Sequence, residues 1–74
     1  MNVGETIRTI LKNKNMRIAT LAKMLGQDRR IVDGMVRREN ITTNKLIKIC
    51  KLLGYKVVLM PIEKRLPDDS YEVE

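Results

Sequence analysis

The stretch "LAKMLGQDRRIVDGM", Leu21–Met35, decides the fold, because two short amphipathic patterns meet in it at a glycine. Gly26 accepts the positive φ of a tight turn. Asp28 is a good N-cap for a following helix, and an apolar residue, Val32, comes one turn later. The apolar residues before the glycine share one helical face: Leu21, Ala22 and Leu25. Two short helices joined by a glycine turn predict a helix-turn-helix.

The same periodicity predicts helices on both sides of this pair. We expect four helices, over residues 3–14, 18–25, 28 to 37 or 38, and 43–53. Asn15 suits the left-handed position after a helix, Gly54 ends the fourth helix, and Thr42 is a suitable N-cap. The expected buried stripes of the first, third and fourth helices are Ile7, Ile10, Leu11 and Lys14 (through its stem), then Val32, Met35 and Val36, then Leu46, Ile49, Cys50 and Leu53.

The pattern changes after Gly54. The run "YKVVLMPI" is apolar and β-branched, and it predicts a strand over 55–60 with Pro61 near its end. No second strand is predicted, and a strand does not leave its N–H and C=O groups bare. The favoured partner is the same strand of a second copy, related by a two-fold axis; the alternative is a strand-like tail packed on the helices. We therefore expect a DNA-binding domain over 1–54, a dimerisation strand over 55–62 and an acidic, flexible tail over 63–74.

Charge is distributed unevenly along the chain. Fifteen Lys and Arg face nine Asp and Glu, a net charge of +6, and four of the acids lie in the last seven residues. Residues 1–65 carry all 15 bases and five acids, a net charge of +10. A small body this basic attracts polyanions, most often nucleic acid; the alternative is a basic protein without such a partner.

Other classes of protein fit the composition poorly. With one cysteine, Cys50, and no histidine, we expect no zinc site, no other metal and no cofactor. A catalytic nucleophile and base cannot be assembled in the usual way, so we do not expect an enzyme. No run of about 20 apolar residues predicts a membrane span, and the N-terminus does not resemble a signal peptide. We expect a cytoplasmic protein.

The residues of the predicted turn resemble a known family. Leu21 and Ala22, then Gly26 opening the turn, then an apolar Val32, are similar to the pattern of the Cro/C1-type (XRE-like) helix-turn-helix family of Cro and the phage repressors. The likeness continues without gaps into "ITTNKLIKICKLLGY" and covers roughly residues 4–55. It implies a mainly α, four-to-five-helix lambda-repressor-like DNA-binding domain. The trailing strand resembles members, some antitoxin regulators among them, that dimerise through a C-terminal strand.

Two positions depart from the family pattern. Members often begin the second helix with Ser or Thr and then Gln, which contact the DNA backbone, and here Arg17 and Ile18 stand there. Arg17 can take the phosphate role, and Ile18 cannot. Members also often bury an Arg–Glu pair between the first and third helices. Leu11 and Val36 occupy those positions, and such an exchange for apolar residues is often neutral or stabilising.

The resemblance places the exposed face of the third helix in the major groove. The base-reading residues it implies are Gln27, Arg29, Arg30, Asp33, Gly34 and Arg37. Arginine reads guanine best, so we expect G·C pairs in each half-site. Asp33 either accepts from a cytosine or, as we favour, orients Arg29 and Arg37. Gly34 is either tolerated noise or a bare position that lets the helix lie deeper in the groove.

The expected backbone contacts flank this helix: Arg17, Lys23, Arg38, Asn40, Thr42, Thr43 and Asn44. The expected dimer contacts are Tyr55, Val57, Val58, Leu59 and Met60. We expect a homodimeric, sequence-specific regulator, a repressor in a bacterial or phage-infected cell, that binds double-stranded DNA at a pseudo-palindromic operator. One alternative is a DNA-binding antitoxin whose tail or dimer surface binds a protein partner. Another is an adaptor that does not bind DNA and does not use Arg29 and Arg30.

Overall fold

Four α-helices and no strand make up the secondary structure of the chain, whose computed structural model describes residues 1–74. The helices are α1 (Val3–Asn13), α2 (Ile18–Leu25), α3 (Arg29–Arg37) and α4 (Thr43–Leu52). They agree with the predicted ranges to within a residue at nearly every end. None of them is both long enough and apolar enough to cross a membrane.

Each helix starts and ends where local chemistry allows it. The side chains of Asn2, Asp28 and Thr42 accept hydrogen bonds from the first turns of α1, α3 and α4. All four helices are followed by a residue with positive φ, and the next amide donates to a carbonyl five residues earlier. Asn15 and Gly26 were predicted at two of these positions, and both are confirmed; Gly54 holds the third. Glu39 holds the fourth, with φ 57°.

The core is aliphatic and lies where the helices meet. α3 packs against α1 and α2, and α4 packs against α2. The buried apolar residues come from all four helices and the end of α4: Ile7, Ile10, Leu11, Leu21, Ala22, Leu25, Val32, Val36, Ile49 and Leu53. Met35, Leu46 and Cys50 are half-buried at its margin, and burial raises the pKa of the Cys50 thiol. The predicted place of Lys14 on the stripe is wrong: Lys14 is the exposed C-cap of α1 and lies beyond the last helical residue, Asn13.

α1 approaches α3 so closely at one point that no side chain fits. A Cβ on Gly4 would overlap the carbonyl oxygen of Val36 and the carboxylate of Glu39. The amide of Gly4 donates to that carboxylate at 2.5 Å. A carboxylate is also favoured at this end of α1, where the helix dipole is positive. The first turn of α1 is thus joined directly to the chain that leaves α3.

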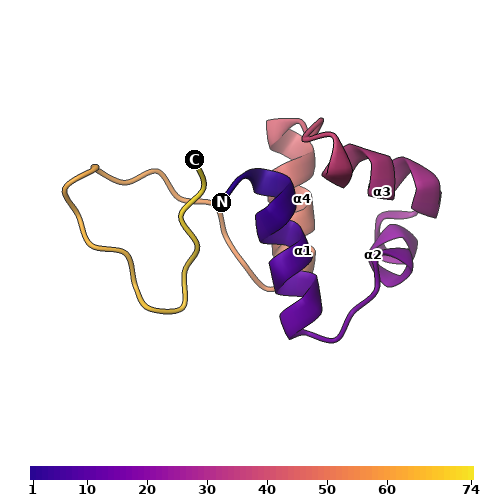
Figure 1. Cartoon of the computed structure of the whole chain (residues 1–74), viewed down its shortest axis with the longest axis horizontal. Helices are drawn as coiled ribbons and strands as arrows, with labels where there is room; N and C mark the ends of the chain where they lie inside the picture. Colours follow the sequence, from indigo (N-terminus) through magenta and orange to yellow (C-terminus); the bar gives the residue numbers. More distant parts are fainter.

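The predicted strand is the main difference between expectation and structure. Residues 55–62 form no strand within the chain, and none of the amides from Lys56 to Glu63 donates to another backbone group. The physical reason is that the chain offers no second strand to pair with. The segment forms an open loop on the side away from α2 and α3, and the two ends of the chain lie close together (Figure 1).

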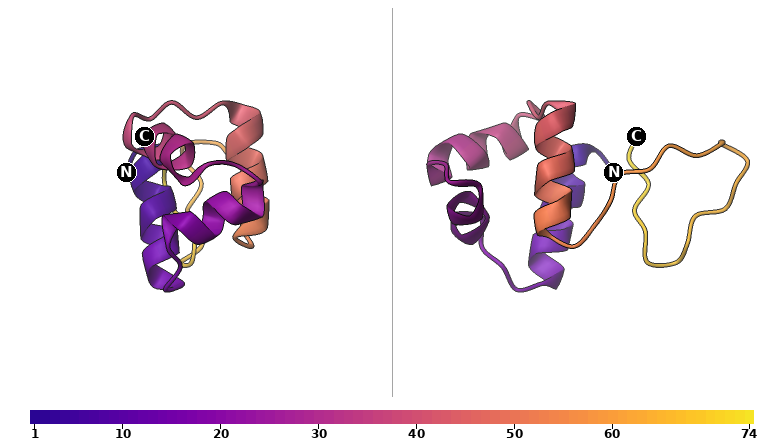
Figure 2. Two further views of the ribbon diagram at one scale, coloured as in Figure 1. Left: turned by 90° about the vertical axis from the view of Figure 1, so that its right-hand side faces the viewer. Right: turned by 180° about the vertical axis from the view of Figure 1, so that it is seen from behind.

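The acidic tail returns to the helices at one aromatic contact. The rings of Tyr55 and Tyr71 lie 5.9 Å apart, and the amide of Asn13 donates to the Tyr71 hydroxyl at 3.1 Å. The backbone amide of Glu74 donates to the carbonyl of Met1 at 2.8 Å. Figure 2 shows this loop behind the helices when α2 and α3 face the viewer. The acidic residues of the tail therefore lie on the side opposite α3.

Candidate nucleic-acid interface

Helix α3 has one face in the core and one face free. Val32 is fully buried and Val36 almost so, and they hold the helix against α1 and α2. Arg29 and Arg30 lie in its first turn and are exposed, and the Arg30 side chain keeps 86% of its surface open. Asp28 caps the helix by accepting from the amide of Arg30 at 2.8 Å. The N-terminal turn of a helix fixed in this way presents two arginines to the outside.

Asp33 orients one arginine of this face. Its carboxylate lies 2.8 Å from a terminal guanidinium nitrogen of Arg37 and also accepts from Arg37 Nε at 3.1 Å. The two residues are one helical turn apart, the spacing at which such pairs form. The expectation that Asp33 also orients Arg29 is wrong, since Arg29 forms no ion pair. Arg29 and Arg37 therefore differ: no ion pair restrains the Arg29 side chain, whereas Asp33 fixes the position of the Arg37 guanidinium.

Gln27 is tied to α4 by a contact that the sequence analysis missed. It is half-buried just before α3, and the Lys45 ammonium donates to its carboxamide oxygen at 3.2 Å. Its NH2 group makes no hydrogen bond within the chain and is left to donate to a partner. The contact joins the first turn of α4 to the start of α3. The helix dipole disfavours a cation in the first turn, so a lysine at that place in the sequence indicates that its ammonium group has a partner elsewhere.

The predicted backbone-contacting side chains are all exposed: Arg17, Lys23, Arg38, Asn40, Thr42, Thr43 and Asn44. The Thr42 hydroxyl accepts from the amide of Lys45, while the amides of Thr43 and Asn44 make no hydrogen bond within the chain. The first amides of α2 are also free, because the Arg17 N-cap provides no side-chain bond. Free amides at a helix N-terminus favour an anion such as phosphate.

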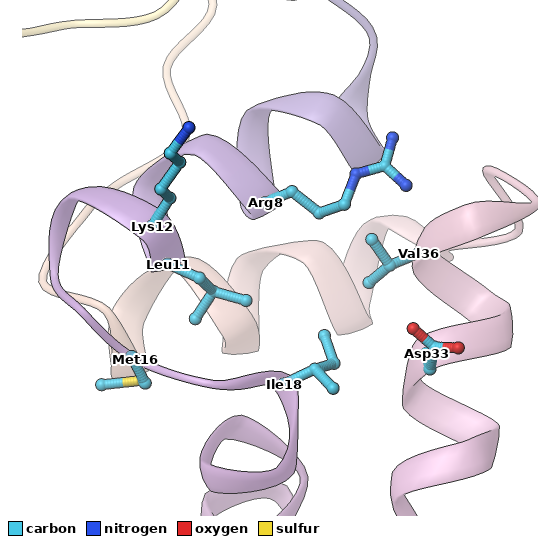
Figure 3. Close-up of a pocket in the computed structure, with 7 residues that line it drawn as sticks. All are labelled: Arg8, Leu11, Lys12, Met16, Ile18, Asp33 and Val36. Atoms are coloured by element: carbon cyan, nitrogen blue, oxygen red, sulfur yellow. The ribbon is translucent and has the colours of Figure 1, made fainter.

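Both helix N-termini lie beside α3. The Gln27–Lys45 bond places the start of α4 next to the start of α3. Ile18, the first residue of α2, and Asp33 line the same surface hollow (Figure 3). The free face of α3 is therefore flanked by the free backbone amides at the starts of α2 and α4, which are suited to bind phosphate.

The comparisons with known proteins agree with this geometry. Residues 6–57 match the sequence profile of the Cro/C1-type HTH DNA-binding domain. The chain belongs to this family. Searches of curated proteins and of solved structures found no significant match. As a Cro/C1-type domain the chain is a DNA-binding protein, and the matched residues include α2, α3 and α4 entirely.

This Cro/C1-type domain has two buried apolar residues, one on α1 and one on α3, where the family often has an ion pair. Leu11 and Val36 are both buried and face each other across the hollow in Figure 3. The two substitutions together leave no unpaired buried charge. Arg8 of α1 is exposed and lines the same hollow as Asp33, with which it forms no ion pair. Arg8 therefore adds a cation near α3 that was not predicted. Its place on the exposed side of an amphipathic helix did not indicate that it lies near α3.

Gly34 lies on the outer face of α3 and is buried under the Arg38 side chain. A Cβ there would lie 3.6 Å from a guanidinium nitrogen of Arg38, an ordinary contact with a movable group. Because alanine favours a helix interior over glycine, Gly34→Ala is expected to raise the free energy of unfolding by up to about 1 kcal/mol. It is also expected to weaken DNA binding, since the methyl group would meet the groove. Urea unfolding and a DNA titration of the same variant check both parts; equal or tighter DNA binding would contradict the second.

Proposed function

We propose that the protein is a transcriptional regulator, a repressor, that binds a pseudo-palindromic operator as a homodimer. The observation that carries this proposal is the division of α3 into a buried apolar side and a free side with three exposed arginines. A repressor of this kind acts by occluding a promoter, and its own promoter is the first to examine. Its place is the cytoplasm of a bacterial or phage-infected cell, and it acts by binding and not as an enzyme.

The arginines of α3 favour guanine as the base that is read. Arginine forms a bidentate bond to guanine O6 and N7 in the major groove, and each such pair discriminates by about 1–3 kcal/mol. Arg29 and Arg30 stand at the helix end that leads into the groove. Gln27, with its carboxamide oxygen held by Lys45, is left to donate to a base acceptor. We therefore expect each half-site to contain G·C pairs at the positions these three residues reach.

Phosphate contacts come from the flanks of α3. The free amides at the starts of α2 and α4, with Arg17 and Arg38, suit two stretches of backbone on either side of the groove. The net charge of +10 over residues 1–65 adds attraction that does not depend on base sequence. Binding should therefore weaken steeply as salt is added.

The segment over residues 55–62 is proposed as the dimer contact. Its amides from Lys56 onward have no backbone partner in the chain, and its apolar side chains are open to solvent, with Leu59 96% exposed. Pairing with the same segment of a second copy satisfies the amides and covers the side chains together. A two-fold axis of this kind relates two α3 helices, which is what a pseudo-palindrome requires.

A double change within the segment is expected to produce a monomer. Val57→Asp with Leu59→Asp places two carboxylates in each copy at the proposed contact, where like charges oppose pairing. Val73→Asp is the matched control, because Val73 is 48% exposed and Val57 46%, yet Val73 lies outside the segment. Sedimentation velocity measures the result. A double variant that stays dimeric, or an unaltered chain that is monomeric, would remove this segment from the proposal.

A DNA-binding antitoxin is the second candidate. The uncovered apolar side chains of residues 57–62 also suit a protein partner, and the acidic tail adds charge near them. Co-expression with the product of a neighbouring gene separates the two candidates. A stable complex that needs Val57 and Leu59 favours the antitoxin, and a homodimer without such a partner favours the repressor.

Selection of bound duplexes from a random pool tests the proposed function. The expected result is an enriched pseudo-palindrome with G·C pairs in each half, its half-sites about one helical turn apart. The Arg29→Ala, Arg30→Ala double variant is the control and should enrich no such sequence. A pool that stays random with the unaltered chain would contradict sequence-specific binding.

A further inference from the structure

A hollow lies on the outer face of α3, between two arginines of the proposed DNA contact. It is lined by Arg30, Ile31, Gly34, Met35, Arg38 and Asn40. Gly34 contributes no side chain to the lining, and it is covered by the side chain of Arg38, whose guanidinium is the nearest group to an added Cβ, at 3.6 Å. We call this feature the Gly34 hollow.

Ile31 is the unexpected member of this set. It is 60% exposed, whereas Val32 and Val36 of the same helix are buried. It lies in the first turn of α3, directly after Arg30, and it belongs neither to the core nor to the polar residues predicted to read bases. A large exposed aliphatic side chain on a basic helix can contribute to binding if the molecule that binds this helix places an apolar group against it.

In the major groove that apolar group is the 5-methyl of thymine. We infer that Ile31 is a specificity-determining residue that contacts a thymine methyl, which enters the Gly34 hollow. The inference rests on the proposed function and adds to it. Arg30 and Ile31 are consecutive, so a guanine bound by the one lies close to the thymine that touches the other. Each half-site therefore contains a thymine next to, or one step from, an arginine-bound guanine.

Removal of that methyl group tests the inference. The duplex selected from the random pool is prepared with each thymine replaced in turn by deoxyuridine, which lacks only the 5-methyl, and affinity is measured by fluorescence anisotropy. One position in each half-site is expected to lose about fourfold in affinity, the effect of one buried methyl group. Ile31→Ala is expected to bind both duplexes equally, and Ile31→Val is expected to retain most of the difference.

Ile47→Ala is the matched control, because Ile47 is a partly exposed isoleucine on α4 outside the hollow. It should keep the fourfold preference for thymine. A selected duplex in which no deoxyuridine matters, or one in which Ile31→Ala keeps the full loss, would overturn the role of Ile31 and leave the proposed function standing. A chain that binds duplexes without any sequence preference would overturn both.

Discussion

Loss of both arginines from the first turn of α3 is expected to lower affinity for the selected operator by about a hundredfold or more. Each bidentate arginine–guanine contact contributes about 1–3 kcal/mol of discrimination, and the double variant Arg29→Ala, Arg30→Ala removes two of them per half-site. Both side chains are exposed, so the fold should be unchanged. Anisotropy titrations of the operator and of a scrambled duplex measure the effect, and circular dichroism checks the helices.

A control variant must remove the same charge elsewhere. Lys48→Ala with Lys51→Ala does so, because both lysines are exposed on α4 and lie beyond its first turn. This variant should lose affinity for both duplexes by a similar small factor, through the salt-dependent attraction alone. If the two double variants weaken operator binding equally, α3 contributes only charge. If neither weakens operator binding, the DNA contact lies elsewhere on the chain and the role proposed for Arg29 and Arg30 is wrong.

Gly4→Ala is expected to destabilise the helical body strongly. The added methyl group would displace the Glu39 carboxylate, and it would overlap the backbone carbonyl of Val36, which cannot yield unless α1 shifts from α3. Overpacking costs about 1–3 kcal/mol, and loss of the bond from the Gly4 amide to a charged acceptor costs about 1.5–3 kcal/mol. We expect the free energy of unfolding to fall by about 3 kcal/mol or more, and Tm to fall by more than about 10 °C.

Gly34→Ala is the matched control for this substitution. Both glycines are buried and helical, and the same methyl group is added to each. Only Gly4 meets backbone, so the two variants should change stability in opposite directions. Thermal unfolding of both, followed by circular dichroism, gives the comparison. A Gly4→Ala variant as stable as the unaltered chain would contradict the close packing of α1 on the end of α3.

The helices could be predicted because their signals are local. Gly26, Asp28 and Thr42 stand within a few residues of the bonds they make, and the apolar stripes repeat within each helix. The Asn2 cap was missed although its bond to Glu5 spans only three residues. The pair fits the pattern of a capping residue followed by an acid three positions later. The sequence therefore contained the signal for this cap.

The contacts between helices could not be predicted because they join residues that are far apart in the chain. Gly4 meets Glu39 across 35 residues, and Gln27 meets Lys45 across 18. Neither pair shows a periodicity that would join it. The predicted strand is not seen in the single chain for a related reason: a strand is stable only with a partner, and nothing within the chain supplies one. Ile31 was missed because its neighbours Val32 and Met35 explain the apolar stripe without it.

Mapping the DNA contact on the protein, residue by residue, tests the central claim most directly. The claim is that the free face of α3 and the flanking starts of α2 and α4 form the DNA contact, while the loop over residues 55–74 lies away from it. Amide chemical shifts of the isotope-labelled protein, recorded as the selected duplex is added, report every residue separately. The predicted result is a set of large changes at Gln27 to Gly34, at residues 18–19 and at residues 43–44, with small changes over residues 63–74. Changes centred on the tail, with α3 unaffected, would contradict it.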